Sequence, residues 1–195
     1  MTNFDPIRPK LHFEVLSPNE IAKIREATLD ILETVGVRFP SARALGILAE
    51  HGAKVDPESQ IVRCPRDLVS AAMSHAPRTY SLSGRVGGAN LILDGSASHF
   101  ATDGSGTEVI DFYTGEYRPS SKADVAMMAH ISDYLPSISF YWPMVSAQDY
   151  GRMGPLHELD ASFNNTTKHI QSVTIIGEKL SRYALEMAEV IAGNK

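Results

Sequence analysis

The chain has 195 residues, a net charge of −5, and an ordinary globular composition of 43% apolar and 21% charged residues. This composition argues against disorder, and the lack of any Lys/Arg run argues against a nucleic-acid surface. The single cysteine, Cys64, excludes an internal disulfide and a multi-cysteine metal site. Because no apolar stretch suggests a signal peptide or a membrane span, we expect a soluble, cytoplasmic protein.

The first part of the chain predicts an extended arm and then a mainly helical segment. Residues 1–16 are rich in Pro and mixed charge, and residues 17–78 carry the helical pattern. Ser17 and Glu20 have the spacing of a capping box, and Pro18 suits the first helical position. Apolar residues then recur at helical spacing up to Gly36, so we expect one buried face. Two further helices are expected, over 41–52 and 65–76, with a short strand between them over 60–65.

From residue 79 the period of the apolar residues shortens to that of strands. Residues 107–119 predict a β-hairpin, and Ser121 with Asp124 predicts the capping box of the helix that follows. The second half then alternates strand and helix, which implies parallel strands with crossover helices. The other expected strands cover 79–85, 90–96, 98–104, 137–145 and 168–176, and the other expected helices cover 154–166 and 177–193.

The glycines of the "DGSG" stretch, Gly104 and Gly106, are a possible phosphate loop. In a dinucleotide site such glycines open a helix, whose N-terminus faces the pyrophosphate. Here they lead into "TEVIDFY", which is β-branched and aromatic. The sequence therefore favours a turn between two strands, or the edge of another pocket, over nucleotide binding.

The order of several segments carries a family resemblance that runs from about Leu16 to the end of the chain. In chain order they are "LSPNEIAKIREATLDILETVGVRF", "ALGILAEHGAKVD", "VRCPRDLVSAAMSHAPRTYSLSGR", "GSGTEVIDFYTGEYRPSSKADVAMMAHISDYLPSISF" and "TTKHIQ". Together they resemble the N-terminal part of the trimethylamine methyltransferase family, which includes glycine betaine and related quaternary-amine methyltransferases.

The resemblance implies a TIM barrel fronted by a helical segment. It also implies transfer of a methyl group from trimethylamine, glycine betaine or a related quaternary amine to the cobalt of a separate corrinoid protein. No cofactor is then bound directly, because the corrinoid (cobalamin) is carried by the partner, and a homo-oligomer is expected. Archaeal trimethylamine enzymes carry pyrrolysine in a later part of the barrel, which this chain does not reach.

Length limits how much of the barrel this chain can hold. A complete barrel takes about 250 residues, so only its opening strands fit before residue 195. The expected fold class is therefore α/β, with residues 17–78 as a helical segment and residues 79–195 as a β-hairpin region plus the first β/α units of an incomplete barrel. Two rivals remain: an inactive fragment or binding module of the family, and an unrelated α/β enzyme.

Barrel sites lie at the C-terminal ends of strands, here "DGSG", "YWPM" and "SVT". A quaternary ammonium has no N–H to donate and is best held by aromatic faces through cation–π contact. Aromatic, acidic and polar residues near these ends are therefore the candidates for substrate binding. They are Phe100, Asp103, Tyr141, Trp142, Gln171 and Thr174.

Each candidate has a proposed role and a structural alternative. Tyr141 and Trp142 would form an aromatic cage, or else pack as ordinary barrel residues. Asp103 would balance the cation, or else cap N–H groups in its turn. Gln171 and Thr174 would bind or orient a substrate carboxylate.

The stretch "HELDA" at 157–161 lacks the second histidine of a zinc motif. We therefore expect His157 and Glu158 to lie on a solvated helix face.

Overall fold

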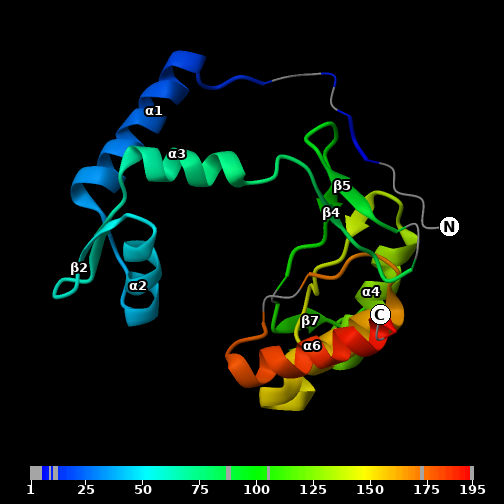
Figure 1. Ribbon diagram of the computed structural model, residues 1–195. Helices are drawn as coiled ribbons and strands as arrows, with labels where there is room; N and C mark the ends of the chain where they lie inside the picture. The colour runs from blue at the N-terminus through cyan, green and yellow to red at the C-terminus, as the bar shows by residue number, and fades with distance from the viewer. Residues whose placement is uncertain are drawn as a thin grey trace. The chain divides into compact units, whose positions relative to one another are not determined.

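The computed structural model describes residues 6–8, 10, 13–86, 89–104, 106–171 and 174–193. The chain divides into two compact units, Lys10–Arg78 and a larger one made of Met1–Pro9 with Thr79–Lys195 (Figure 1). Parts of two predicted segments, the arm over 1–16 and the strand over 168–176, lie outside the described residues.

The smaller unit consists of helices around a small antiparallel sheet. The strands, in the spatial order β1-β3-β2, are β1 (Val37–Arg38), β2 (Lys54–Asp56) and β3 (Ile61–Arg63). The helices are α1 (Pro18–Asp30), continued by the π-helical turn η1 (Ile31–Val35), then α2 (Ala42–Glu50) and α3 (Arg66–His75). The three helices follow the predicted order, and the short strands between them form the sheet.

Local hydrogen bonds explain where the first helix begins and ends. The predicted capping box is confirmed: the N–H of Ser17 donates to Glu20 Oε2 at 2.8 Å, and the N–H of Glu20 donates to Ser17 Oγ at 3.4 Å. Gly36 ends the helical run with φ +84°, and a Cβ there would lie 2.6 Å from the carbonyl oxygen of Val62. The position therefore requires glycine, both for its backbone conformation and for the close approach of β3.

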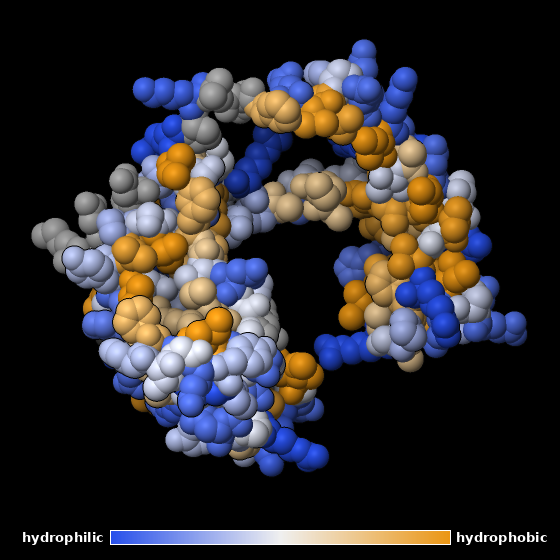
Figure 2. Space-filling view, turned by 180° about the vertical axis from the view of Figure 1, so that it is seen from behind, coloured by the Kyte–Doolittle hydropathy of each residue, from blue (hydrophilic) through white to orange (hydrophobic). Residues whose placement is uncertain are grey.

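The predicted buried face of α1 is wrong for this structure. No residue of α1 is buried, and Ile21 and Ile24 are 56% and 55% exposed. Figure 2 shows hydrophobic residues gathered over this helix. Helical spacing shows that apolar residues share a face, but it does not show what covers that face.

The larger unit is a mixed α/β structure that contains two hairpins and two short parallel pairings. The hairpins are β4 (Tyr80–Leu82) with β5 (Leu91–Leu93), and β7 (Glu108–Ile110) with β8 (Tyr117–Pro119). Strand β6 (Phe100–Ala101) pairs in parallel with β9 (Ile138–Phe140), and Tyr141 forms a parallel bridge with Ile170. The described residues form small sheets and no closed barrel.

Helices connect these parallel segments. Helix α4 (Lys122–Tyr134) lies in the chain between β6 and β9, and α5 (Gly154–Asn165) lies between β9 and Ile170. The 3-10 segment η2 (Gln148–Met153) precedes α5, and α6 (Glu178–Ala192) follows Ile170. Helix α5 packs against both α4 and α6.

A small apolar core lies where α4 and α5 meet the strands. Its buried members are Val125, Val145 and Ala161, and Val109 from the hairpin β7–β8 packs against them. The hairpin is also tied to α4 by Arg118, which forms salt bridges of 2.8 Å to both Asp111 and Asp124. Asp124 is in turn the capping-box residue of α4, as predicted, with Ser121 as the N-cap.

Candidate functional site

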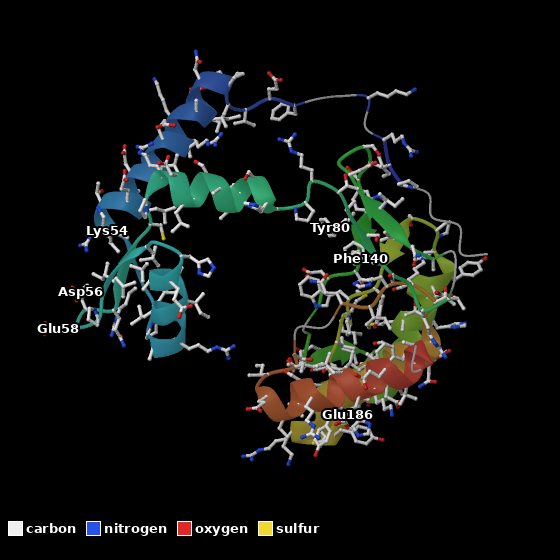
Figure 3. The ribbon with its side chains drawn as sticks, in the orientation of Figure 1. Lys54, Asp56, Glu58, Tyr80, Phe140 and Glu186 are labelled. Carbon is white, nitrogen blue, oxygen red and sulfur yellow. The ribbon has the colours of Figure 1, made fainter. Side chains whose placement is uncertain are left out.

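The C-terminal ends of the parallel segments bring most of the predicted site residues into one region. Alternation along β9 decides which way each side chain points. Ser139 and Tyr141 are fully buried, and the hydroxyl of Tyr141 donates to the carbonyl oxygen of Val125 in α4 at 3.2 Å. Phe140 and Trp142 therefore lie on the opposite side of the strand, away from α4 (Figure 3 labels Phe140).

Tyr141 thus occupies the layer between strand and helix. Burial raises the pKa of its hydroxyl above the ordinary value. Its backbone joins the next parallel segment, since its N–H donates to the carbonyl of His169 and its carbonyl accepts from the N–H of Gln171, both at 2.9 Å. Tyr141 and Trp142 consequently do not face each other.

Trp142 is held by the segment that follows β6. The backbone N–H of Trp142 donates to Thr102 Oγ1 at 2.9 Å, and the Thr102 hydroxyl donates to the backbone carbonyl of Trp142 at 2.6 Å. A Cβ on Gly104 would lie only 2.2 Å from Nε1 of the indole. Glycine at this position therefore lets the backbone at Gly104 lie against the Trp142 ring, which accounts for the first glycine of the stretch.

Two phenylalanines share the side of the strands on which Trp142 lies. Nδ1 of His99 is 3.4 Å from Oγ of the buried Ser139, which places His99 on the helix side of β6. Alternation then places Phe100 on the other side with Phe140. Phe100 is 49% exposed, and Phe140 is half-buried. The sequence interpretation missed Phe140, although its spacing of two from Trp142 in a strand was a signal for it.

The indole N–H of Trp142 is buried and has no hydrogen-bond partner among the described residues. Such orphaned donors are rare, because a buried N–H without an acceptor carries the full cost of desolvation.

Asp103 lies exposed at the turn after β6. Its Oδ1 accepts a hydrogen bond from the N–H of Gly104 at 2.9 Å, so it caps one neighbouring N–H, as in the structural alternative given above. Because the carboxylate is exposed, this contact leaves it able to face a cation.

Gln171 and Thr174 follow the bridge residue Ile170 in the chain, and both are half-buried. The hydroxyl of Thr174 donates to Oε2 of Glu158 in α5 at 2.5 Å. Glu158 is only 3% exposed, so the expectation of a solvated position for this residue is wrong. The helix turns Glu158 toward the strands, whereas the half-buried His157 stacks on Tyr150 with ring centroids 3.5 Å apart.

Within the described part of the chain, no group of three His, Cys, Asp or Glu side chains is placed to hold a metal ion. None of the helices described there is long and apolar enough to cross a membrane.

Comparison with known protein families identifies the relatives of this chain. A family model described as trimethylamine methyltransferase (MTTB) matches residues 3–195. The chain belongs to this family. The resemblance noted in the sequence is therefore confirmed.

Individual relatives agree with the family match. The chain is 33% identical over 180 residues to the trimethylamine methyltransferase MttB of Desulfitobacterium hafniense, a match that covers 92% of this chain and 36% of that protein. It is 29% identical over 178 residues to MttB1 of Methanosarcina acetivorans, covering 89% and 36%. A proline betaine:corrinoid methyltransferase of Eubacterium limosum is 28% identical over 128 residues, covering 65% and 25%. The chain thus spans about a third of the length of the curated relatives it matches.

Proposed function

We propose that this chain forms the N-terminal part of a corrinoid-dependent methyltransferase acting on trimethylamine, glycine betaine or a related quaternary amine. The family match over residues 3–195 carries the proposal. The names of the relatives support the substrate class, since they act on trimethylamine and on proline betaine.

The larger unit supplies the opening strands of a TIM barrel in this proposal. The parallel pairing of β6 with β9, and of Tyr141 with Ile170, supports it, because a helix separates each strand from the next. Parallel strands joined by helices are the repeating unit of that barrel. The hairpin β7–β8 is then an insertion between the first strand and its helix.

The substrate cation is held on the side of the strands that Phe100, Phe140 and Trp142 share. Aromatic faces attract a quaternary ammonium through the negative face of the ring, and the gain grows when water is excluded. Asp103 balances the positive charge from the turn after β6. Tyr141 supports this wall from the helix side.

The polar end of a betaine is met by Gln171 and Thr174. The side-chain amide of Gln171 offers two donors to a carboxylate. The single proton of the Thr174 hydroxyl is already donated to Glu158, so its oxygen is left as an acceptor. Of the two, Gln171 is therefore the residue that donates to the carboxylate.

The nucleophile comes from outside the chain. A corrinoid in its Co(I) state, carried by a partner protein, would supply the nucleophile that takes up the methyl group. This chain's residues hold the ammonium, aim one methyl group outward and exclude water. The aromatic rings and the amide at the strand ends fit that holding role.

A methyl-transfer assay tests the proposal. The chain is joined to the remaining part of the D. hafniense relative, and transfer from trimethylamine and from glycine betaine to a reduced corrinoid protein is followed by methyl-cobalt formation. We expect transfer by the folded chimera. A folded chimera that transfers nothing, beside an active D. hafniense enzyme, would favour an inactive or binding module.

A second assay reads substrate binding directly. Trp142 is the single tryptophan of the chain, so its fluorescence reports on the proposed site alone. We expect tetramethylammonium and glycine betaine to quench it, whereas 3,3-dimethylbutyrate, the uncharged-carbon isostere of glycine betaine, leaves it unchanged. Equal quenching by the isostere would rule out a cation–π site.

A further inference from the structure

A buried carboxylate on α5 lies beneath the strand ends. Glu158 is 3% exposed, and among the described residues it forms no salt bridge. A buried carboxylate without a counter-ion is costly unless hydrogen-bond donors compensate it. Two donors meet its oxygens: the N–H of Ala147 at 3.3 Å from Oε1 and the hydroxyl of Thr174 at 2.5 Å from Oε2.

These two donors belong to different loops. Ala147 is 1% exposed and lies five residues after Trp142, just before η2. Thr174 lies three residues after Gln171. One side chain from a helix therefore joins the segment that follows β9 to the segment that follows Ile170, and both segments carry residues of the proposed amine site.

We propose that Glu158 is a positioning residue for that site: it holds the two loops together and sets the direction of the Thr174 hydroxyl. The inference rests on the proposed function only for the identity of the ligand. The contacts of Glu158 with Ala147 and Thr174 are independent of that function. Glu158 does not touch the substrate, because its carboxylate is enclosed and both of its oxygens are engaged by the chain.

The hydrogen bond to Glu158 fixes which way the proton of Thr174 points. A hydroxyl has a single proton, and Thr174 donates its proton to Oε2 of Glu158, so it cannot donate to a ligand. A glutamine in the same place can keep its oxygen toward Ala147 and turn its NH₂ group toward Thr174. The hydrogen bond is then reversed, and the hydroxyl proton of Thr174 is released toward the site.

This reversal gives Glu158→Gln a result that loss of stability alone would not produce. We expect Glu158→Gln to bind tetramethylammonium within about twofold of the wild type and glycine betaine about fivefold more tightly, which is the worth of roughly one added hydrogen bond. Glu158→Ala loses both contacts and should bind both ligands about tenfold more weakly. Quenching of Trp142 measures all four affinities.

Ligand-free measurements separate this inference from the proposed function. Acrylamide quenching of Trp142 and hydrogen exchange of the Ala147 amide should both increase in Glu158→Ala and stay near wild type in Glu158→Gln. Thr174→Val, which keeps the side-chain shape, should raise only the quenching and serves if Glu158→Ala does not fold. Asn164→Ala, an exposed change on the same helix, is the matched control.

Three outcomes are decisive. If Glu158→Ala behaves like Asn164→Ala in the ligand-free measurements, the positioning role is overturned. If Glu158→Gln weakens both ligands equally, the reversal of the Thr174 hydrogen bond is overturned. If the wild type binds neither ligand but the ligand-free differences remain, the proposed function fails while the contact between the loops stands.

Discussion

Thr102 and Trp142 exchange two hydrogen bonds across the ends of two parallel strands. One hydroxyl accepts the N–H of Trp142 at 2.9 Å and donates to its carbonyl at 2.6 Å. A side chain thus continues the pairing of β6 with β9 past the last residue of each strand. The single tryptophan is held at this junction, at the centre of the proposed amine site.

Thr102→Val should release this junction, because valine keeps the shape of threonine but neither accepts nor donates. Leaving the partly buried N–H of Trp142 without an acceptor should cost about 1–3 kcal/mol in the free energy of unfolding. Urea unfolding measures the loss, and the emission of Trp142 should shift to the red. Thr107→Val, at an exposed threonine, is the control. An unchanged emission maximum would show that the junction does not hold the ring.

Gly104→Ala should displace the indole ring of Trp142, since the added Cβ would lie 2.2 Å from Nε1. We expect a destabilisation of about 1–3 kcal/mol, as for other overpacked positions, together with loss of ammonium quenching. Gly46→Ala is a matched control in α2, where an added Cβ meets nothing within 4 Å. That change should stabilise the chain by about 0.5–1 kcal/mol through helix propensity. If both variants behave alike, the contact with Trp142 is unimportant.

Acid should weaken the contact between the hairpin β7–β8 and α4. Hydrogen bonding to Arg118 lowers the pKa of Asp111 to about 2, and the same guanidinium lowers the pKa of Asp124 to about 2. Because both pKa values lie below the unfolded value of about 4, the stabilisation is complete above pH 4. It is lost as the pH falls from about 4 to about 2.

Arg118→Met should flatten this pH dependence, whereas Arg182→Met, at an exposed pair with Glu186, should leave it unchanged. The free energy of unfolding measured at pH 7, 4 and 3 gives the slope for each variant. Equal slopes for Arg118→Met and the wild type would show that other carboxylates dominate acid unfolding.

The isolated chain should show no methyl transfer and should self-associate. A barrel removes its sheet edges by closing, and the described strands form no closed barrel, so their edges can pair with another copy. Phe100, 49% exposed on β6, gives such a pairing an apolar contact. Light scattering coupled to size exclusion should show dimers or larger species, and Phe100→Asp should reduce them. A monomer that demethylates glycine betaine at enzymatic rates would contradict both halves of this prediction.

Local chemistry allowed the helix starts to be predicted from the sequence. The capping boxes of Ser17 with Glu20 and of Ser121 with Asp124 form as expected, because each joins atoms only three residues apart. The hairpin over 107–119 follows for the same reason, since its turn and its strand pairs are neighbours in the chain. The order of the sequence segments also predicted the family correctly.

Tertiary structure decided which faces are covered. Neighbouring positions in a strand point to opposite sides, so only the packing of α4 on β9 could place Tyr141 in the helix layer and Trp142 on the other side. Glu158 looked like a surface residue because its partners, Ala147 and Thr174, lie 11 and 16 positions away in the chain. Burial of a polar group depends on hydrogen-bond donors from such distant segments. The residues next to Glu158 in the sequence therefore do not predict its burial.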